Sequence, residues 1–288
     1  MQLALAVDVG GTKLAAGLVT AEGDLVTSAS SPTPRDVDAE SLFSVVLALC
    51  DAVGGDGEMV VCGVGCGGPM TRGGEEVSPL NIPAWRRFPL RLRLAQATGL
   101  PTFVDNDAKA LALGEGWKGA AAGCDNFIAM VVSTGVGGGI VLDGRLLDGA
   151  DGNAGHIGHV IVEPEGRLCV CGARGCLEAE ASGLAIAAVT GRPAAEADAA
   201  TVARTGRLVG QAVASVANLL DLRLAVVGGS VALGFADPFF GAAQAELDER
   251  ARLEFSAGAR IVPVGLGERG PLVGAAAVGW RGLRAGGR

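Results

Sequence analysis

Apolar residues follow two kinds of pattern along this chain of 288 residues. Short apolar runs that stop at glycine predict buried strands, whereas longer runs with apolar residues three or four positions apart predict helices. Strands are predicted at residues 3–9, 13–20, 25–30, 58–69 (running into a loop), 100–106, 224–230 and 259–264, with three more inside 126–147. Helices are predicted at residues 38–53, 88–99, 107–117, 204–222 and 270–280. Because strands and helices alternate, the sequence predicts an α/β fold.

The helix at 204–222 has the clearest spacing. Its apolar residues recur at positions 208, 209, 212, 213, 216, 219 and 220, which lie on one face of a helix. The helix at 38–53 has a similar pattern, and Asp38 is suited to cap its first turn by accepting a backbone N–H bond.

One pattern occurs twice. Residues 3–20 contain an apolar strand, a glycine-rich turn with threonine and a second strand, and residues 126–147 repeat that order. The two copies start about 125 residues apart, and a similar unit at the start of each half predicts two related lobes.

Composition and charge narrow the class of protein. Apolar residues make up 49% of the chain, so a sizeable core can be buried, and the net charge is −8. A negative surface disfavours nucleic acid and anionic membranes as partners, although it leaves small phosphate ligands open. No apolar run approaches the length of a membrane span, and the first strand is broken by Asp8 and lacks the basic start of a signal peptide. We therefore expect a cytoplasmic protein without a membrane partner.

Three glycine-rich turns share one chemistry. Each follows a predicted buried strand and combines consecutive glycines with a hydroxyl side chain, at residues 8–13, 133–139 and 227–230. Glycine lets backbone N–H groups approach a phosphate closely, and Lys13 adds a positive charge while Asp8 could hold a metal ion. Tight turns without a ligand are the alternative for any one of them. The candidate phosphate-binding residues are Asp8, Gly10, Gly11, Thr12, Lys13, Ser133, Thr134, Gly135, Gly137, Gly228, Gly229 and Ser230.

None of the three turns has the spacing of the common nucleotide motifs. A P-loop would read G-x-x-x-x-G-K-[ST], and a dinucleotide-binding turn would read G-x-G-x-x-G at the start of a helix. A Rossmann-type dinucleotide fold is therefore disfavoured.

Asp107 is the candidate catalytic residue. It lies where the strand at 100–106 is followed by a helix, and the positive end of the helix dipole favours its ionised form. Such a carboxylate can accept a proton from a hydroxyl that attacks a γ-phosphate. The alternative is that Asp107 only caps the helix. Asp105 is expected to have a structural role.

The stretch from residue 155 to 178 holds both histidines of the chain and three of its seven cysteines. Three thiolates and one imidazole are a suitable ligand set for tetrahedral zinc, and the alternative is a set of unconnected buried cysteines. The other cysteines, at 50, 62, 66 and 124, are expected to fill the core. The candidate zinc ligands are His159, Cys169, Cys171 and Cys176.

Taken together, these motifs resemble those of the sugar kinase, actin and Hsp70 superfamily. The sequences D-x-G-G-T, S-T-G-x-G-G-G and V-x-G-G-S carry that resemblance, and the chain is more closely similar to the ROK family of repressors, open reading frames and kinases. The resemblance implies a two-lobed actin-like ATPase (ribonuclease H-like) fold with ATP in a cleft between lobes. It implies a small lobe of residues 1–107 joined by a final helix at 271–288, and a large lobe of residues 108–270 with a zinc-binding loop.

The resemblance also implies roles for single residues. Asp107 would take the proton of the 6-hydroxyl of a hexose, the phosphate turns and Mg²⁺ would bind ATP, and the zinc would be structural. The sugar ligands implied in this way are Gly68, Asn81, Asn106, Asp107, His156, His159 and Glu178.

His156 departs from the usual pattern of the family. Most ROK kinases have E-x-G-H here, whereas this chain reads H-I-G-H. A neutral imidazole has one donor and one acceptor, so we expect an altered preference at the C1 or C2 hydroxyl. The form A-G-H-I-G-H resembles N-acetylmannosamine kinases, whereas SPLNIPAW at 78–85 resembles glucokinases. We expect a glucose-like hexose as substrate, with N-acetylmannosamine or another amino sugar as the alternative.

A transcriptional regulator and a sugar sensor without catalysis are two alternatives to a kinase. Regulators of the family have a helix-turn-helix of roughly 70 to 80 residues before the kinase-like part, whereas the first phosphate turn here begins at Asp8 and the net charge is negative. A sugar sensor without catalysis would need no proton acceptor, which Asp107 and Lys13 argue against. The family's members are commonly dimers or tetramers, which implies a homo-oligomer.

Overall fold

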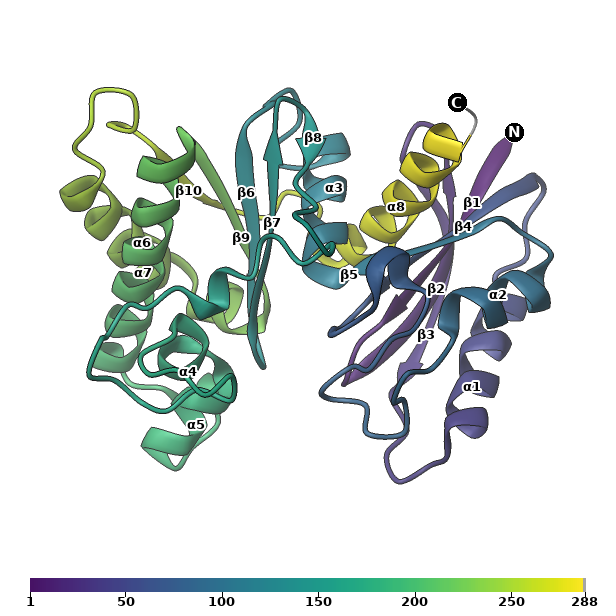
Figure 1. Cartoon of the computed structure of the whole chain (residues 1–288), viewed down its shortest axis with the longest axis horizontal. Coiled ribbons are helices and arrows are strands. Elements are labelled where there is room, and N and C mark those ends of the chain that lie inside the picture. Colours follow the sequence, from purple (N-terminus) through teal and green to yellow (C-terminus); the bar gives the residue numbers. More distant parts are fainter. Residues whose placement is uncertain (287–288) are drawn as a thin grey trace. The chain divides into compact units, whose positions relative to one another are not determined.

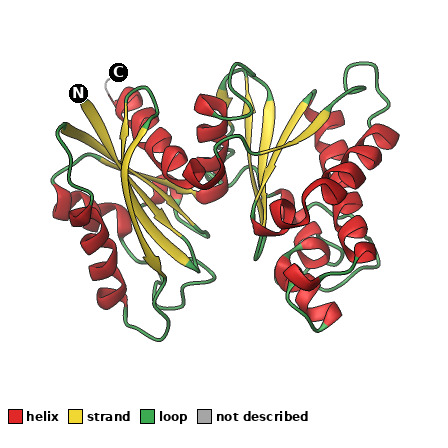
Figure 2. Cartoon of the chain, turned by 180° about the vertical axis from the view of Figure 1, so that it is seen from behind, coloured by secondary structure: helices red, strands yellow, loops and turns green. Residues whose placement is uncertain are grey.

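The computed structural model describes residues 1–286, and its contacts divide the chain into two compact units. Unit 1 comprises Met1–Gly119, Asp148–Gly152 and the chain from Leu266 onward, and unit 2 comprises Ala120–Leu147 and Asn153–Gly265. Each unit is a sheet with helices packed against it (Figure 1, Figure 2). The mixed α/β class predicted from the sequence is confirmed. The expected lobe boundary at residue 107 differs from the boundary at residue 119, and the final two residues of the expected helix at 271–288 lie outside the described residues.

The sheet of unit 1 has five strands in the order β3-β2-β1-β4-β5. Strand β1 pairs antiparallel with β2 and parallel with β4, and β5 pairs parallel with β4. The strands are β1 (Gln2–Val9), β2 (Lys13–Thr20), β3 (Leu25–Pro32), β4 (Glu58–Cys66) and β5 (Thr102–Asn106). The carboxyl ends of β1, β4 and β5 therefore lie at one edge, where polar residues of different strands can meet.

The two faces of β1 carry side chains of different size. Leu3, Leu5, Val7 and Val9 join the core that includes residues of α1 (Ala39–Ala52) and α2 (Leu90–Thr98). Ala4 and Ala6 join a smaller core with residues of α8 (Gly270–Gly286). Small residues on this face let α8 lie close to the sheet, since strand residues alternate between faces. Asp38 caps α1 as predicted, because its Oδ1 accepts the Ser41 N–H at 2.7 Å.

Close backbone packing fixes α3 (Asp107–Lys118) and α8 in unit 1. A Cβ on Gly274 would lie 2.5 Å from the carbonyl oxygen of Ala110, and one on Gly63 would lie 2.0 Å from that of Ala275. No side chain fits such gaps, so glycine is required for helix and sheet to approach. This packing explains why α3 belongs to unit 1 rather than to the unit that follows it.

The sheet of unit 2 has five strands in the order β10-β9-β6-β7-β8. Strand β6 pairs antiparallel with β7 and parallel with β9, as β1 does with β2 and β4. The predicted repeat is thus present in the strand pairing of both units. The strands are β6 (Phe127–Val132), β7 (Val136–Leu142), β8 (Arg145–Leu146), β9 (Leu224–Gly228) and β10 (Arg260–Pro263).

Two long helices, α6 (Ala199–Leu220) and α7 (Ser230–Arg250), supply much of the core of unit 2. The chain before α6 forms α4 (Leu177–Ala181) and α5 (Gly183–Thr190). Short 3₁₀ helices occur at η1 (Arg72–Gly74), η2 (Ile157–His159), η3 (Ala194–Glu196) and η4 (Gly267–Arg269). Among residues 1–286, no helix has both the length and the apolarity needed to cross a membrane.

Replacing Gly274 with alanine is expected to lower the free energy of unfolding by about 1–3 kcal/mol, because the new methyl group would collide with the backbone of α3. Gly241→Ala is the matched control, since this glycine lies in α7 with nothing within 4 Å of an added Cβ. Helix propensity predicts that the control raises the free energy of unfolding by up to about 1 kcal/mol. Urea unfolding followed by circular dichroism measures both. Equal effects of the two variants would contradict the close packing of α8.

Candidate functional site

The first glycine turn, residues 10–13 of unit 1, is held by the end of β3. The Gly10 carbonyl accepts the Thr33 hydroxyl at 2.7 Å, and the Thr12 carbonyl accepts the Thr33 N–H at 3.0 Å. A Cβ on Gly11 would lie 2.4 Å from the Cβ of Asn81, so the turn and Asn81 are in close contact. The structure thus brings a predicted phosphate turn beside a predicted sugar ligand.

Asp8 and Asp107 converge above Gly65. A Cβ at Gly65 would lie 3.8 Å from Asp8 Oδ1 and 3.8 Å from the Asp107 Cα. Burial raises the pKa of Asp8 to about 7, the negative charge of Asp107 acts in the same direction, and Lys13 opposes both. Carboxylate oxygens are preferred ligands of hard divalent cations, and repulsion between two nearby negative charges favours a bound cation. Asp8 and Asp107 therefore fit a cation such as Mg²⁺.

Asn106, rather than Asp107, is the N-cap of α3. The Asn106 Oδ1 accepts the Ala108 N–H at 3.0 Å, and Asp107 Oδ1 also accepts this N–H at 2.9 Å. The alternative in which Asp107 serves only as the cap therefore does not describe this helix start. The amide nitrogen of Asn106 faces Gly68, since a Cβ there would lie 3.5 Å from Nδ2.

The loop after β4 keeps Gly68 and Asn81 together. The Gly68 carbonyl accepts the Leu80 N–H at 3.1 Å, and the Pro69 carbonyl accepts the Ser78 N–H at 2.8 Å. Unit 1 therefore gathers the first phosphate turn and the residues Asp8, Gly68, Asn81, Asn106 and Asp107 at the carboxyl edge of its sheet.

In unit 2, the second and third glycine turns meet. The hydroxyl oxygens of Ser133 and Ser230 lie 2.9 Å apart. Gly229 has φ +96°, and a Cβ there would lie 2.4 Å from the Val132 carbonyl oxygen, so a residue with a side chain would be strained and would collide. Helix α7 begins at Ser230, so its first N–H groups add to the donors of the turns.

Glu178, the predicted sugar ligand on α4, is held by the second turn. Its Oε2 accepts the Val136 N–H at 2.9 Å, and a Cβ on Gly135 would lie 2.8 Å from the same oxygen. One carboxylate oxygen is thus fixed by the backbone between the turn and β7.

His156 precedes the short helix η2, and His159 is its last residue. Their ring centroids lie 6.1 Å apart and both side chains are exposed. Gly158 lies against β7, since a Cβ there would lie 2.2 Å from the Val136 carbonyl oxygen. The backbone that carries both histidines is therefore packed on the strand that follows the second turn.

The four predicted zinc ligands form one cluster, with ligand atoms all within 4.8 Å of one another. Cys171 Sγ lies 3.7 Å from Cys176 Sγ, and Cys169 Sγ lies 3.7 Å from His159 Nδ1. Tetrahedral zinc with bonds of about 2.3 Å to sulfur and 2.0–2.1 Å to nitrogen places ligand atoms roughly 3.6–3.8 Å apart. The sulfur separation is too long for a disulfide and fits zinc. The alternative of unconnected cysteines is therefore wrong.

The pKa values of two thiols in this cluster are shifted in opposite directions. Burial raises the pKa of Cys176, and the neighbouring thiols add to that effect. The pKa of Cys171 lies below its ordinary value, chiefly because of the Ala173 backbone N–H. A bound cation would favour the thiolate form of both, since metals bind thiolates rather than thiols.

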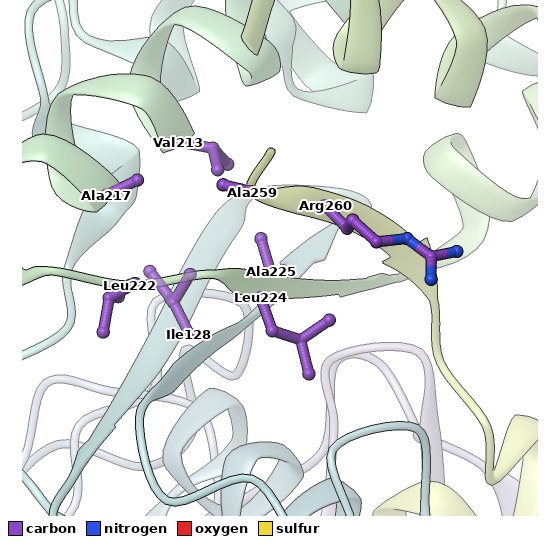
Figure 3. Close-up of a pocket in the computed structure, with 8 residues that line it drawn as sticks. All are labelled: Ile128, Val213, Ala217, Leu222, Leu224, Ala225, Ala259 and Arg260. Atoms are coloured by element: carbon purple, nitrogen blue, oxygen red, sulfur yellow. The ribbon is translucent and has the colours of Figure 1, made fainter. Parts of the chain in front are cut away.

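Two cavities differ in character. Figure 3 shows the one in unit 2, where apolar side chains of β9, α6 and their neighbours face each other and Arg260 extends away from them. It has no room for a water molecule and is a packing gap. The cavity in unit 1 has about 280 Å³ and is lined by charged residues, among them Asp105, Lys109, Asp148 and Arg281. Sequence reasoning did not single out the last three, because charges distant in the sequence have no recognisable spacing.

Asp8 generates a prediction about pH. Its pKa is about 7 in the folded protein and near 3.8 ordinarily, so the folded state binds its proton more tightly. Stability from this group is present below about pH 4 and is lost as the pH rises to about 7, by a few kcal/mol at most. Without added magnesium, Asp8→Asn should remove this loss and be more stable than the wild type at pH 8. Urea unfolding at pH 4, 6 and 8 measures it, and parallel pH profiles for the two proteins would show that Asp8 does not titrate there.

The metal cluster generates a second prediction. Cys176→Ser should abolish the binding of one zinc per chain and lower Tm by roughly 5 °C or more, because a loss of about 2 kcal/mol shifts Tm by that much in a domain of this size. Cys124→Ser is the control, since Cys124 lies outside the cluster. Elemental analysis and calorimetry measure the two effects. Zinc retained in the first variant, or lost in the control, would contradict the assigned ligand set.

The chain is similar to known proteins over much of its length. The ROK family model matches residues 4–280. N-acetylmannosamine kinase of Escherichia fergusonii is 37% identical over 247 residues, which cover 80% of this chain and 83% of that protein. Glucokinase of Thermotoga maritima is 41% identical over 184 residues, which cover 63% of this chain and 58% of that protein.

Solved structures agree in fold. A ROK family glucokinase from Streptomyces griseus, in complex with glucose and AMPPNP, is 30% identical with a TM-score of 0.83, and the match covers 97% of this chain and 99% of that one. The ROK hexokinase from Thermus thermophilus is 32% identical with the same TM-score, covering 98% and 99%. With a family match across nearly its whole length and two closely superimposable structures, this chain belongs to the ROK family and has its actin-like ATPase fold.

Proposed function

We propose that this chain transfers the γ-phosphate of ATP to the 6-hydroxyl of a hexose, with a glucose-like sugar favoured. The observation that carries the proposal is the placement of Asp107 at the start of α3, beside Asp8 and the first glycine turn. The relatives named above are sugar kinases, which supports the same activity.

The chemistry needs one proton acceptor and stabilisation of the phosphate charge. The sugar oxygen forms a bond to the γ-phosphorus, the bond from this phosphorus to the bridging oxygen of ADP breaks, and the hydroxyl proton goes to the Asp107 carboxylate. The positive end of the α3 dipole and the Ala108 N–H, which Asp107 Oδ1 accepts, favour a negatively charged carboxylate at this position. The backbone N–H groups of the three turns and Lys13 would hold the phosphates.

The residues present also fit the two metal ions implied by the family. Mg²⁺ would be held at Asp8 and would neutralise charge on the phosphates. Zinc at His159, Cys169, Cys171 and Cys176 would have four protein ligands and hence a structural role. It would fix the loop between η2 and α4, which carries His156 at one end and Glu178 at the other.

A second candidate function is phosphorylation of N-acetylmannosamine or another amino sugar. His156 favours it, because an imidazole at this position offers one donor and one acceptor where a carboxylate offers only acceptors. The N-acetylmannosamine kinase relative covers more of the chain than the glucokinase relative does. A sugar sensor without catalysis is the third candidate, and it would bind a sugar without turnover.

A sugar panel with ATP and Mg²⁺ tests the proposal. ADP release should be much faster with one sugar than with the rest of glucose, mannose, glucosamine, kanosamine, N-acetylglucosamine and N-acetylmannosamine. Asp107→Asn should lower kcat at least about a hundredfold, because it removes the proton acceptor. Asp51→Asn is the control, since Asp51 is an exposed carboxylate at the end of α1. Sugar binding without turnover in zinc-loaded wild-type protein would contradict the kinase and favour the sensor.

A further inference from the structure

Lys109 is a buried cation with three partners. Its side chain is 4% exposed, and it lies in the first turn of α3, two residues after Asp107. The ammonium nitrogen lies 2.9 Å from Asp105 Oδ1, 2.8 Å from Asp148 Oδ1 and 3.1 Å from the Gly152 carbonyl oxygen. An ammonium group has three N–H donors, so these three acceptors satisfy it completely.

Arg281 of α8 binds the same two carboxylates from the other side. Its Nη2 lies 2.6 Å from Asp148 Oδ2, and its Nη1 lies 3.5 Å from Asp105 Oδ2. Two cations and two anions thus alternate in a closed network. Burial would raise the pKa of Asp148, but hydrogen bonds from Lys109 and Arg281 outweigh it and hold that pKa below its ordinary value.

The network holds a short segment, Asp148–Gly152, which we call the strap. The strap belongs to unit 1, although the chain on both sides of it, Ala120–Leu147 and Asn153–Gly265, belongs to unit 2. Lys109 binds the side chain of the first strap residue and the carbonyl of the last one. Strap residues also line the 280 Å³ cavity of unit 1, and direct hydrogen bonds of 2.6–3.1 Å from Lys109 and Arg281 hold Asp148 and Gly152 beside it.

Two parts of this network, Asp105 and the strap, are close in sequence to predicted functional residues. Asp105 Oδ1 also accepts the Asn106 N–H at 2.8 Å, next to Asp107. At the other end of the network, His156 follows Gly152 by four positions in the chain, a span of at most about 14 Å. Residues 153–155 therefore connect the strap directly to His156 along the chain.

We propose that Lys109 and Asp148 are positioning residues for the sugar, because they tie the segment of the proton acceptor to the strap that leads into the histidine loop. This inference rests on the proposed kinase function. Neither residue contacts the reacting atoms in this account. Each acts through the segments that it holds. Both residues therefore lower the KM for the sugar relative to a variant without them and leave the KM for ATP unchanged.

A purely structural ion pair is the competing explanation, and it makes different predictions. Removing one partner of a buried pair lowers stability wherever the pair lies. A purely structural pair predicts no change that is confined to the KM for the sugar. It also predicts that a neutral side chain of the same shape does not reverse the effect of removing the pair. A KM effect confined to the sugar, and its reversal by a neutral side chain, therefore distinguish a positioning role from a purely structural one.

The test compares Asp148→Ala with Asp148→Asn in the full-length, zinc-loaded protein. The alanine variant should raise the KM for the sugar about tenfold and leave that for ATP within about twofold, because misplacing binding groups weakens binding of that substrate alone. The asparagine variant should recover part of the loss, since its amide oxygen can still accept the Lys109 N–H, whereas its amide nitrogen cannot accept from Arg281. Glu40→Gln is the matched control, because it breaks the Arg93–Glu40 ion pair of unit 1, which lies outside the network.

Hydrogen exchange of peptides covering residues 148–159 gives a second readout that does not depend on turnover. Faster exchange there in Asp148→Ala, with wild-type exchange in Glu40→Gln, is expected. Wild-type exchange in Asp148→Ala overturns the inference, whether or not the enzyme is active. An unchanged sugar KM, or equal changes in both KM values, overturns it as well. If the wild-type protein turns over no sugar, the proposed function is wrong. The hydrogen-exchange result then decides by itself whether Asp148 holds the strap.

Discussion

The placement of Asp8 and Asp107 at the same edge of one sheet is the constraint on which the candidate site depends. It follows from the sheet of unit 1, where Asp8 pairs in register with Gly65, and Gly65 with Asp105. Parallel pairing brings these strand ends to one edge, and the chain then turns directly into α3 with Asp107 as its first residue. Glycine at 65 leaves space above the sheet, and Asp8 Oδ1 and the Asp107 Cα each lie 3.8 Å from the position that its Cβ would occupy. The negative charge of Asp107 adds to the raised pKa of Asp8, and a cation bound there would relieve this repulsion.

The sequence was informative wherever a local pattern determines the structure. Strand β2 has the predicted bounds, Asp38 caps α1, and Gly99 ends α2 in the left-handed conformation. The cysteine cluster was predictable because three cysteines and a histidine share one short stretch, and the structure brings their ligand atoms together. The repeated strand–turn–strand unit predicted two related sheets for the same reason, since each copy is continuous in sequence.

The sequence was less informative where distant residues decide the structure. Helix α7 was missed because Ala236 has φ +50° and Pro238 follows, so the helical spacing is interrupted. The lobe boundary was placed at residue 107, since nothing local shows that α3 packs against α8 through Gly274 and Ala110. The network of Lys109 with Asp148 and Arg281 joins positions far apart in the chain. Glu178 was expected as a sugar ligand, but its hydrogen bond to the second glycine turn was not foreseeable.

In the proposed reaction, the proton acceptor at the start of α3 directs phosphoryl transfer to the 6-hydroxyl of a hexose. Phosphorus-coupled proton NMR of the product measures this most directly. Transfer to the 6-hydroxyl is expected to give a phosphomonoester whose phosphorus couples to the two protons on C6. Phosphate on the anomeric oxygen, or release of inorganic phosphate without a sugar phosphate, would contradict it.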